Sequence, residues 1–426
     1  MPKLPVLMLS LALLALTRQA AAQIDDPQSQ LLALEDLDRQ VGELSQFDRF
    51  NHQALEPLLA SFRVAIELNQ FELAAASMER ALQITRISQG LYAEEQIPLL
   101  KLMVENDIRR GEWTAVNSNL EHLYWLLTRK RETVDAELID ELMTISRYHL
   151  QAVNADHVDN QGYHYLNATG ITRLAVRAGS LLWGDHDLRL VPLQYELVKL
   201  YFRQAAAIED GGNTAMKLRA VVPGTGWTHS RKAARRSLYQ AGLSRLRDMQ
   251  RSFDRQTPPD REAAAMVSLY IADWQLLFAE ENAAEAYQAA YQRLAQSGVD
   301  AWLLSRYFAE PVPLPIESFH TTLAQAREDR SRPHWIATAA PRSTDEVATV
   351  ALTLGPLTKI SRWIDGRYVS RMGVAQTVEI LQQPAGDPLA AEEMGERFHD
   401  LHFRPRLNGG AVEPVQTTFN YLLTAD

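Results

Sequence analysis

The chain of 426 residues contains no cysteine. This absence excludes disulfide bonds, thiolate catalysis, zinc–thiolate sites and a lipidated N-terminal cysteine, although it does not fix the cellular compartment. Any metal site would have to be built from histidine and carboxylate side chains. The sequence also lacks a Gly-x-Ser-x-Gly nucleophile elbow and a His-Glu-x-x-His pair. We therefore expect a binding protein with no catalytic residues, no cofactor and no metal.

Long apolar runs are missing too, and the longest lies at the N-terminus. Residues 4–16 are apolar except for Ser10, follow a basic start at Lys3, and precede the small-residue sequence 20–22. Thirteen residues are too few to span a hydrocarbon layer of about 30 Å, so the pattern is typical of a signal peptide. We predict cleavage after residue 22, a first mature residue Gln23 and a periplasmic destination; an uncleaved anchor is the alternative.

Basic residues are fewer than acidic ones. Lysine and arginine number 43 against 53 aspartates and glutamates, which gives a formal net charge of −10. Removal of the signal peptide takes away Lys3 and Arg18 and leaves −12. An acidic chain disfavours non-specific binding to nucleic acid, so we expect protein partners, such as outer-membrane or other envelope proteins.

Helical periodicity is the strongest pattern that is present. Apolar residues recur in residues 113–127 at offsets 0, 3, 7, 10, 11 and 14 from Trp113, which is one face of a helix. The same spacing begins at Phe71, 42 residues earlier, and at Glu280, 209 residues after Phe71 and close to five periods of 42. The first helices also echo one another, since 56–59, 97–100 and 191–194 each place a proline in a first helical turn.

Small and large side chains alternate in these helices in a way that lets two antiparallel helices pack closely. The residues that carry the pattern are Phe71, Ala74, Met78, Ala81, Trp113, Leu120, Ala283, Tyr287 and Ala290. The pattern resembles that of the tetratricopeptide (TPR) repeat, although the usual period there is about 34 residues. The resemblance implies a mainly α fold, an antiparallel helical-repeat solenoid over residues 23–300, whose concave groove takes up peptide segments. An ordinary non-repeating helical domain is the alternative.

After residue 300 the residue pattern changes. Three prolines in residues 310–316 predict an extended segment, so we expect a proline-containing linker over residues 301–343. Beyond it the apolar period becomes two. This alternation predicts strands at 350–354, 360–364, 374–381 and 415–421, and an N-cap and proline predict a helix over 387–401.

This strand, strand, helix, strand order ends in the segment 402–412. The segment and the last strand carry an aromatic-x-Pro sequence, a glycine turn and a closing strand, at Phe403, Pro405, Gly410, Val412 and Phe419. They resemble the C-terminal domain of the TonB family. The resemblance implies a small α+β domain over residues 344–426 and an exposed sheet edge that pairs with a partner peptide. It does not imply energy transduction, because this chain has a signal peptide and a helical array in place of a membrane anchor and a long spacer.

Residues 229–256 form a basic stretch with eight lysines or arginines against two aspartates. Arg231, Lys232, Arg235 and Arg236 are a candidate docking patch for an acidic partner; a solvated helix face is the plainer interpretation. Asp156, His157, Asp159 and His164 carry possible metal ligands, but a loop explains their spacing better. The Gly-rich residues 223–226 lack the lysine of a phosphate loop and indicate a turn.

These patterns predict a periplasmic protein that binds or scaffolds other proteins without catalysis. It would bind peptide segments through a helical groove and through a sheet edge. An accessory of outer-membrane transport is the alternative among binding proteins, and a cell-envelope hydrolase is the alternative among enzymes.

Overall fold

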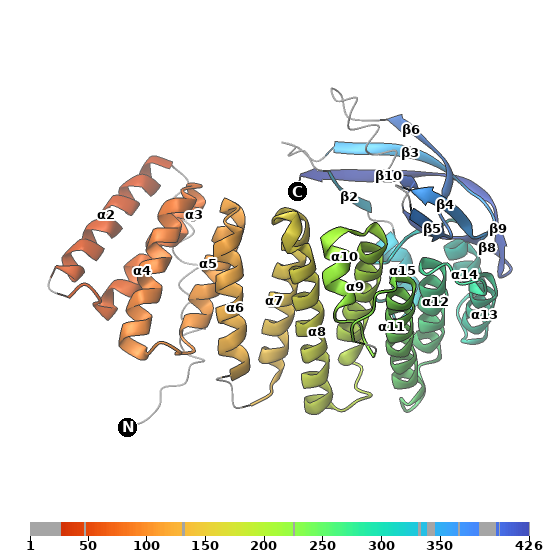
Figure 1. The fold of residues 1–426 in the computed structure, drawn as a ribbon, viewed down its shortest axis with the longest axis horizontal. Helices are drawn as coiled ribbons and strands as arrows, with labels where there is room; N and C mark the ends of the chain where they lie inside the picture. Colours follow the sequence, from red (N-terminus) through yellow and green to blue (C-terminus); the bar gives the residue numbers. More distant parts are fainter. Residues whose placement is uncertain are drawn as a thin grey trace. The chain divides into compact units, whose positions relative to one another are not determined.

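The computed structural model describes residues 27–46, 48–129, 133–224, 226–330, 334–338, 346–364, 367–382, 398–399 and 401–425. The predicted signal peptide lies outside these residues. The described chain is mainly α, with fourteen α-helices that pack in sequential pairs, followed by a small and mostly antiparallel β region (Figure 1). It divides into two compact units, residues 1–133 and 134–426. The domain boundaries predicted from the sequence stay a prediction.

In the first unit, each helix packs against the next one in sequence. Its described elements are α2 (Pro27–Ser45), the 3-10 turn η1 (His52–Ala54), α3 (Leu55–Glu67), α4 (Phe71–Gln89), α5 (Gln96–Arg110) and α6 (Trp113–Arg129). The unit's core consists of the apolar faces that the periodicity predicts, such as Met78 and Ala81 on α4 and Leu120 on α6, none of which is exposed.

The helices of the second unit continue the same sequential pairing. They are α7 (Ala136–Ala155), the 3-10 turn η2 (Val158–Asn160), α8 (Gln161–Trp183), α9 (Leu190–Asp210), α10 (Gly212–Arg219), α11 (Arg231–Asp254), α12 (Arg261–Leu277), α13 (Ala283–Gln296), α14 (Ala301–Phe308) and α15 (Leu323–Arg330). Side-chain caps begin four of them, because Asp135, Ser230, Asp260 and Asp300 each accept a hydrogen bond from a backbone N–H three residues later.

Prolines and loops repeat in the helical region as the sequence suggests. Pro57, Pro98 and Pro192 are each the third residue of their helix, α3, α5 and α9. The α4–α5 and α8–α9 loops also have the same pattern of backbone hydrogen bonds. Each bond from the N–H groups of residues 90, 93, 96 and 97 has a counterpart 94 residues later. The two loops are therefore local structural repeats, at an interval that is not a multiple of the predicted 42.

The β region contains more strands than the sequence predicts. They are β1 (Val312–Leu314), β2 (His334–Thr338), β3 (Glu346–Leu354), β4 (Ile360–Ile364), β5 (Arg367–Arg371), β6 (Ala375–Gln382), β7 (His402–Arg404), β8 (Arg406–Asn408), β9 (Ala411–Glu413) and β10 (Val415–Ala425). The strands predicted at 350–354, 360–364, 374–381 and 415–421 correspond to β3, β4, β6 and β10. Most of the predicted helix lies outside the described residues, and only Phe398 and His399 of it are described as helical.

The main sheet has four described strands in the order β2-β10-β3-β6. β10 pairs with β3 in the antiparallel sense and with β2 in the parallel sense. The simple strand, strand, helix, strand order is therefore incomplete, and the last strand lies inside the sheet rather than at its edge. Sequence alternation shows that a strand is half-buried, but it does not show which strands become its neighbours.

Residues 301–330, which we expected in the linker, contain folded elements. α14 and α15 contribute Leu304, Phe308 and Leu323 to the same buried apolar cluster as α9, α11, α12 and α13. β1 pairs with β7, which connects this segment to the β region. β7, β8 and β9 in turn contact α12, α14 and α13. Within the second unit, the β region thus packs directly on the helices.

A search of the described helices for one long and apolar enough to cross a membrane finds none.

Candidate functional site

The structure buries most of the apolar side chains that carry the repeat pattern. Ala74, Met78, Ala81, Leu120, Ala283, Tyr287 and Ala290 are buried, whereas Phe71 and Trp113 are half-buried at the first positions of their helices. These side chains form helix contacts and line no open surface. Their assignment to a particular repeat family stays a prediction.

The five residues of the C-terminal motif also have structural positions. Phe403 on β7 is 1% exposed, and its ring centroid lies 5.5 Å from that of Phe419 on β10. Pro405 separates β7 from β8. Gly410 has φ +92°, as expected for the glycine turn between β8 and β9, and Val412 packs against the helical core. The motif thus joins the sheet to the helices.

The four residues of the predicted basic patch differ in how far their side chains are exposed. Arg231, Lys232 and Arg236 are exposed on α11, but Arg235 turns inward. Its guanidinium donates hydrogen bonds to the carbonyl oxygens of Leu277 and Phe278, which end α12, at 3.1 and 3.0 Å. Burial lowers the pKa of Arg235, although Glu209 at 2.8 Å favours its charged form. Arg235 therefore takes part in helix packing, although 20% of its side chain is exposed, and the docking patch as a whole stays a prediction.

The exposed part of this patch offers little free charge for an anion. Arg236 forms an ion pair with Glu280 at 3.0 Å, and it stacks on the ring of Tyr239. An open recess of about 640 Å³ lies beside it, and its charged lining residues are Lys232, Arg235, Arg236 and Lys359 together with Glu280 and Glu281. Because Arg236 already pairs with Glu280 and Arg235 with Glu209, we do not assign the recess an acidic ligand.

Asp273 on α12 and Arg404 on β7 are deeply buried charged side chains, at 4% and 1% exposure. The guanidinium meets the carboxylate through two hydrogen bonds, Nε to Oδ1 at 2.9 Å and Nη2 to Oδ2 at 2.5 Å. The hydroxyl of Tyr287 donates to the same carboxylate at 2.8 Å, and Arg404 also donates to Tyr307. Burial alone would lower the pKa of Arg404, but the carboxylate of Asp273 holds that pKa well above its ordinary value.

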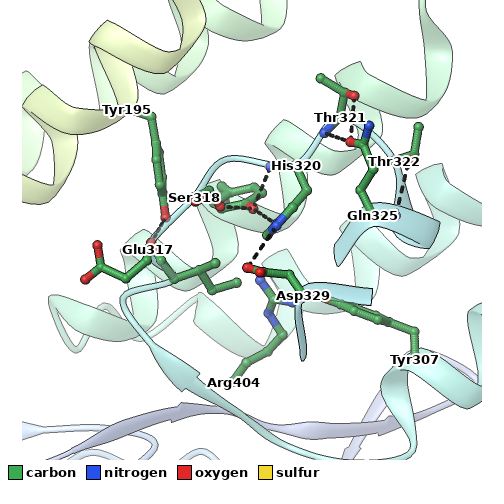
Figure 2. A network of polar contacts seen from close by, with 12 residues as sticks. Tyr195, Tyr307, Glu317, Ser318, His320, Thr321, Thr322, Gln325, Asp329 and Arg404 are labelled. Carbon is green, nitrogen blue, oxygen red and sulfur yellow. Dashed lines mark hydrogen bonds and ion pairs between the residues drawn. The ribbon is translucent and has the colours of Figure 1, made fainter. Parts of the chain in front are cut away.

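A second polar group lies near this pair (Figure 2). The hydroxyl of Tyr270 lies 3.1 Å from His320 Nδ1 and 3.1 Å from the carbonyl oxygen of Ser318, and its single proton can serve one of them at a time. His320 Nε2 meets Asp329 of α15 at 3.2 Å, and Tyr195 donates to the carbonyl of Ile316. The adjoining cavity holds only about 20 Å³, room for a single water rather than a substrate. The network thus connects the 316–329 segment to α9 and α12.

One weak sequence signal points to this network. Arg404 lies between two of the motif residues, Phe403 and Pro405, in a segment that otherwise indicates a core position. Its partner Asp273 is 131 residues away, and no local pattern connects the two.

His164 is buried on α8 rather than in a solvated loop. His164 on α8 and His149 on α7 approach through their Nδ1 atoms at 3.1 Å, and His164 Nε2 meets Asp156 at 2.8 Å. Burial lowers the pKa of both rings and favours their neutral forms. In a neutral pair the carboxylate takes the proton on Nε2 of His164, so Nδ1 of His164 accepts and Nδ1 of His149 donates. His157 and Asp159 are exposed, and no group of three metal-ligating side chains is found among the described residues.

This neutral pair predicts a loss of stability in acid. Burial, and then His164, lower the pKa of His149 to about 3, and burial lowers that of His164. The unfolded rings take up protons near pH 6.5, so stability is full above this pH and is lost as the pH falls towards 3. Through His149 we expect the free energy of unfolding to fall by roughly 2 kcal/mol between pH 7 and pH 4.5, measured by urea titration.

The control for this prediction is a comparison of slopes. His149→Gln should flatten the dependence of the unfolding free energy on pH, whereas His157→Gln, at an exposed position, should leave it as in the unchanged chain. Equal slopes in all three proteins would contradict the assignment.

The first unit exposes four apolar side chains on the end of α4, on the loop that follows it and on α6. Ile87 at the end of α4, Leu91 and Tyr92 in the α4–α5 loop, and Trp125 in α6 are 59%, 53%, 47% and 36% exposed. The ring centroids of Tyr92 and Trp125 lie 4.5 Å apart. We call these four side chains the apolar loop surface. The sequence analysis counted none of them as site residues, because an isolated exposed apolar residue carries no signal.

A buried glutamine holds this loop in place. Gln96 at the start of α5 is fully buried, and its amide nitrogen donates to the carbonyl oxygens of Gly90 and Leu91 at 3.1 and 2.8 Å. Its amide oxygen accepts from Arg86 at 3.0 Å and lies 3.2 Å from a ring nitrogen of His122. The loop is therefore fixed from beneath by a satisfied polar side chain, while its apolar side chains face solvent.

The corresponding α8–α9 loop also exposes apolar side chains. Leu181 occupies the position of Ile87, 94 residues later, and is 73% exposed; Leu182 and Leu188 are exposed beside it in sequence. Exposed apolar residues thus recur at equivalent helix ends in both units.

The comparisons with known proteins leave the chain without an assigned family. No protein-family model matches it, and a search of curated proteins finds no match. The functional argument therefore depends on the chain's own geometry.

Proposed function

We propose that the protein is a non-catalytic scaffold of the periplasm, which binds segments of partner proteins through its helical units. The observation that carries this proposal is the apolar loop surface. Single exposed apolar residues are ordinary, but Ile87, Leu91 and Tyr92 are close together in sequence. Tyr92 is in ring contact with Trp125, and exposed Tyr and Trp are typical of interaction sites. The periplasmic location is supported by the signal-peptide pattern of residues 1–22.

The order of the helices supports a TPR-like solenoid as the scaffold. Helices that pack in sequential pairs, with prolines and loop hydrogen bonds in equivalent places, are what a repeat array requires. Because Leu181 repeats the position of Ile87, each helical unit offers an apolar contact of its own. A partner segment long enough to reach several such contacts would gain avidity.

A second candidate, an accessory of outer-membrane transport, rests on the TonB-like C-terminal domain. The order β2-β10-β3-β6 leaves β2 and β6 as the outer strands of the described sheet. Since β10 already has partners on both sides, a peptide that adds a strand would pair with β6 or β2. Leu381 on β6 is 54% exposed and marks this edge.

Photo-crosslinking from three positions distinguishes these candidates. We would place a photoreactive amino acid at Leu91, at Leu381 or at Val158 in the full chain, expressed in a Gram-negative host and irradiated in intact cells. Val158 is the matched control, because it is 62% exposed but lies outside both surfaces. We expect discrete protein adducts from Leu91 alone, and we expect Trp125→Ala to abolish them.

Each other outcome has a definite meaning. Adducts from Leu381 alone would favour the sheet edge and the transport accessory. Equal labelling from all three positions would indicate non-specific contact and contradict the proposal. No adduct from any position would contradict both binding functions and return the envelope hydrolase to consideration.

A further inference from the structure

We infer that the apolar loop surface binds a protein segment that has an apolar anchor flanked by lysine or arginine. This inference rests on the proposed function and names the chemistry of the partner. It depends on three features of the first unit: the charge around the surface, its aromatic pair and the rigidity of its loop.

The charge near the surface is negative. Glu94 and Glu95 follow the exposed Leu91 and Tyr92 after Ala93, and both are exposed. Residues 27–129 as a whole carry fifteen aspartates and glutamates against nine lysines and arginines. An interface tends to match opposite potentials, and like charges across it weaken binding. A basic segment is therefore favoured over an acidic one.

Two arginines lie nearby and limit this charge without reversing it. Arg86 is half-buried, and its Nε donates to Gln96, so it supports the loop from within. Arg129 is exposed one helical turn beyond Trp125. An approaching segment thus meets two exposed carboxylates beside Tyr92 and one exposed guanidinium beside Trp125.

The aromatic pair favours cations in addition to apolar groups. The faces of Tyr and Trp rings attract lysine and arginine at distances up to about 6 Å, and the attraction is largest for Trp. Tyr92 and Trp125 lie in contact, with their planes inclined at 40°. An apolar anchor can therefore pack on Ile87 and Leu91 while a neighbouring cation lies against the rings and the carboxylates.

The support from Gln96 makes the surface suitable for a short segment. Binding costs conformational entropy when a loop must become ordered, and a loop that is already fixed avoids that cost. Gln96 accounts for the carbonyl groups of Gly90 and Leu91, so Leu91 and Tyr92 keep their positions without a ligand.

The inference is tested with defined peptides and the full mature chain. Three fluorescent twelve-residue peptides share a central Leu-Trp anchor and differ only in the residues on both sides, which are lysine, serine or glutamate. We expect fluorescence anisotropy at low salt to show binding in the order lysine, serine, glutamate, with the lysine peptide roughly tenfold tighter than the glutamate peptide. Reversing both charges, Glu94→Lys with Glu95→Lys, should invert this order.

Two tryptophan variants locate the binding. Trp125→Ala should weaken the lysine peptide roughly tenfold, as loss of a central aromatic anchor does. Trp302→Ala is the matched control, since Trp302 is 63% exposed in the second unit, and it should leave binding unchanged.

The remaining outcomes separate this inference from the proposed function. Equal affinity for all three peptides, lost in Trp125→Ala, would overturn the basic partner and leave the binding surface intact. Peptide binding that Trp125→Ala does not affect would overturn the assignment of the surface. If no peptide binds, or if sedimentation shows that a second copy of the chain occupies the surface, the inference is overturned, and crosslinking from Leu91 then decides the proposed function independently.

Discussion

Replacing Arg404 with alanine should lower the free energy of unfolding by about 3 to 5 kcal/mol, as is typical when one partner of a buried ion pair is removed. The carboxylate of Asp273, which is 4% exposed, would lose the guanidinium that pairs with both of its oxygens. The hydroxyl of Tyr307 would lose its charged hydrogen-bond donor. The loss should also loosen β7 from α12. Urea unfolding, followed by circular dichroism and by tryptophan fluorescence, measures the effect.

Two further variants make this prediction specific. Arg406→Ala removes a half-exposed arginine only two residues away, which meets Glu413 at 3.6 Å, and it should cost less than about 1 kcal/mol. Replacing both partners, Asp273→Leu with Arg404→Met, should recover most of the loss, because no unpaired charge is left in the core. A loss below about 1 kcal/mol for Arg404→Ala would show that the site admits water.

Gly242→Val should destabilise the second unit by about 1 to 3 kcal/mol, the usual cost of overpacking a core. Gly242 lies inside α11, and a Cβ at this position would come 2.2 Å from the ring of Trp274 on α12. The ring has little freedom to move, because its Nε1 donates to the carbonyl of Tyr239 at 2.9 Å. The two helices would have to separate, and thermal unfolding would report the change.

Gly170→Ala on α8 is the matched control. It is also a helical glycine, but its added Cβ would meet no atom within 4 Å. Alanine is a better helix former than glycine, so this variant should gain about 0.5 to 1 kcal/mol. If both variants changed stability in the same direction, close packing at Gly242 would not be the cause.

The local structure was largely predictable from sequence. The 3.6-residue periodicity marked the buried faces of α4, α6 and α13, and proline in the first turn marked the starts of α3, α5 and α9. The alternation of apolar and polar residues predicted β3 and β10. The turn at Gly409 and Gly410 has the positive φ angles that glycine allows. These features depend on residues close in sequence, where side-chain direction and backbone sterics act directly.

The candidate site was not predictable to the same extent. Tyr92 and Trp125 are 33 positions apart, and the sequence does not show that the α4–α5 loop reaches α6. Arg235 carried the same charge pattern as Arg236, yet one side chain caps α12 and the other lies on the surface. Burial of a polar side chain depends on whether another element offers it a hydrogen-bond partner.

By itself, the sequence determined the helical class, the positions of several helices and strands, and the acidic character of the first unit. Only the tertiary structure decided that β10 lies inside its sheet, that Asp273 meets Arg404 and that His149 meets His164. The physical reason is the range of the interactions. Periodicity and caps are local, whereas strand order, buried ion pairs and the grouping of exposed apolar residues depend on contacts between segments far apart in the chain.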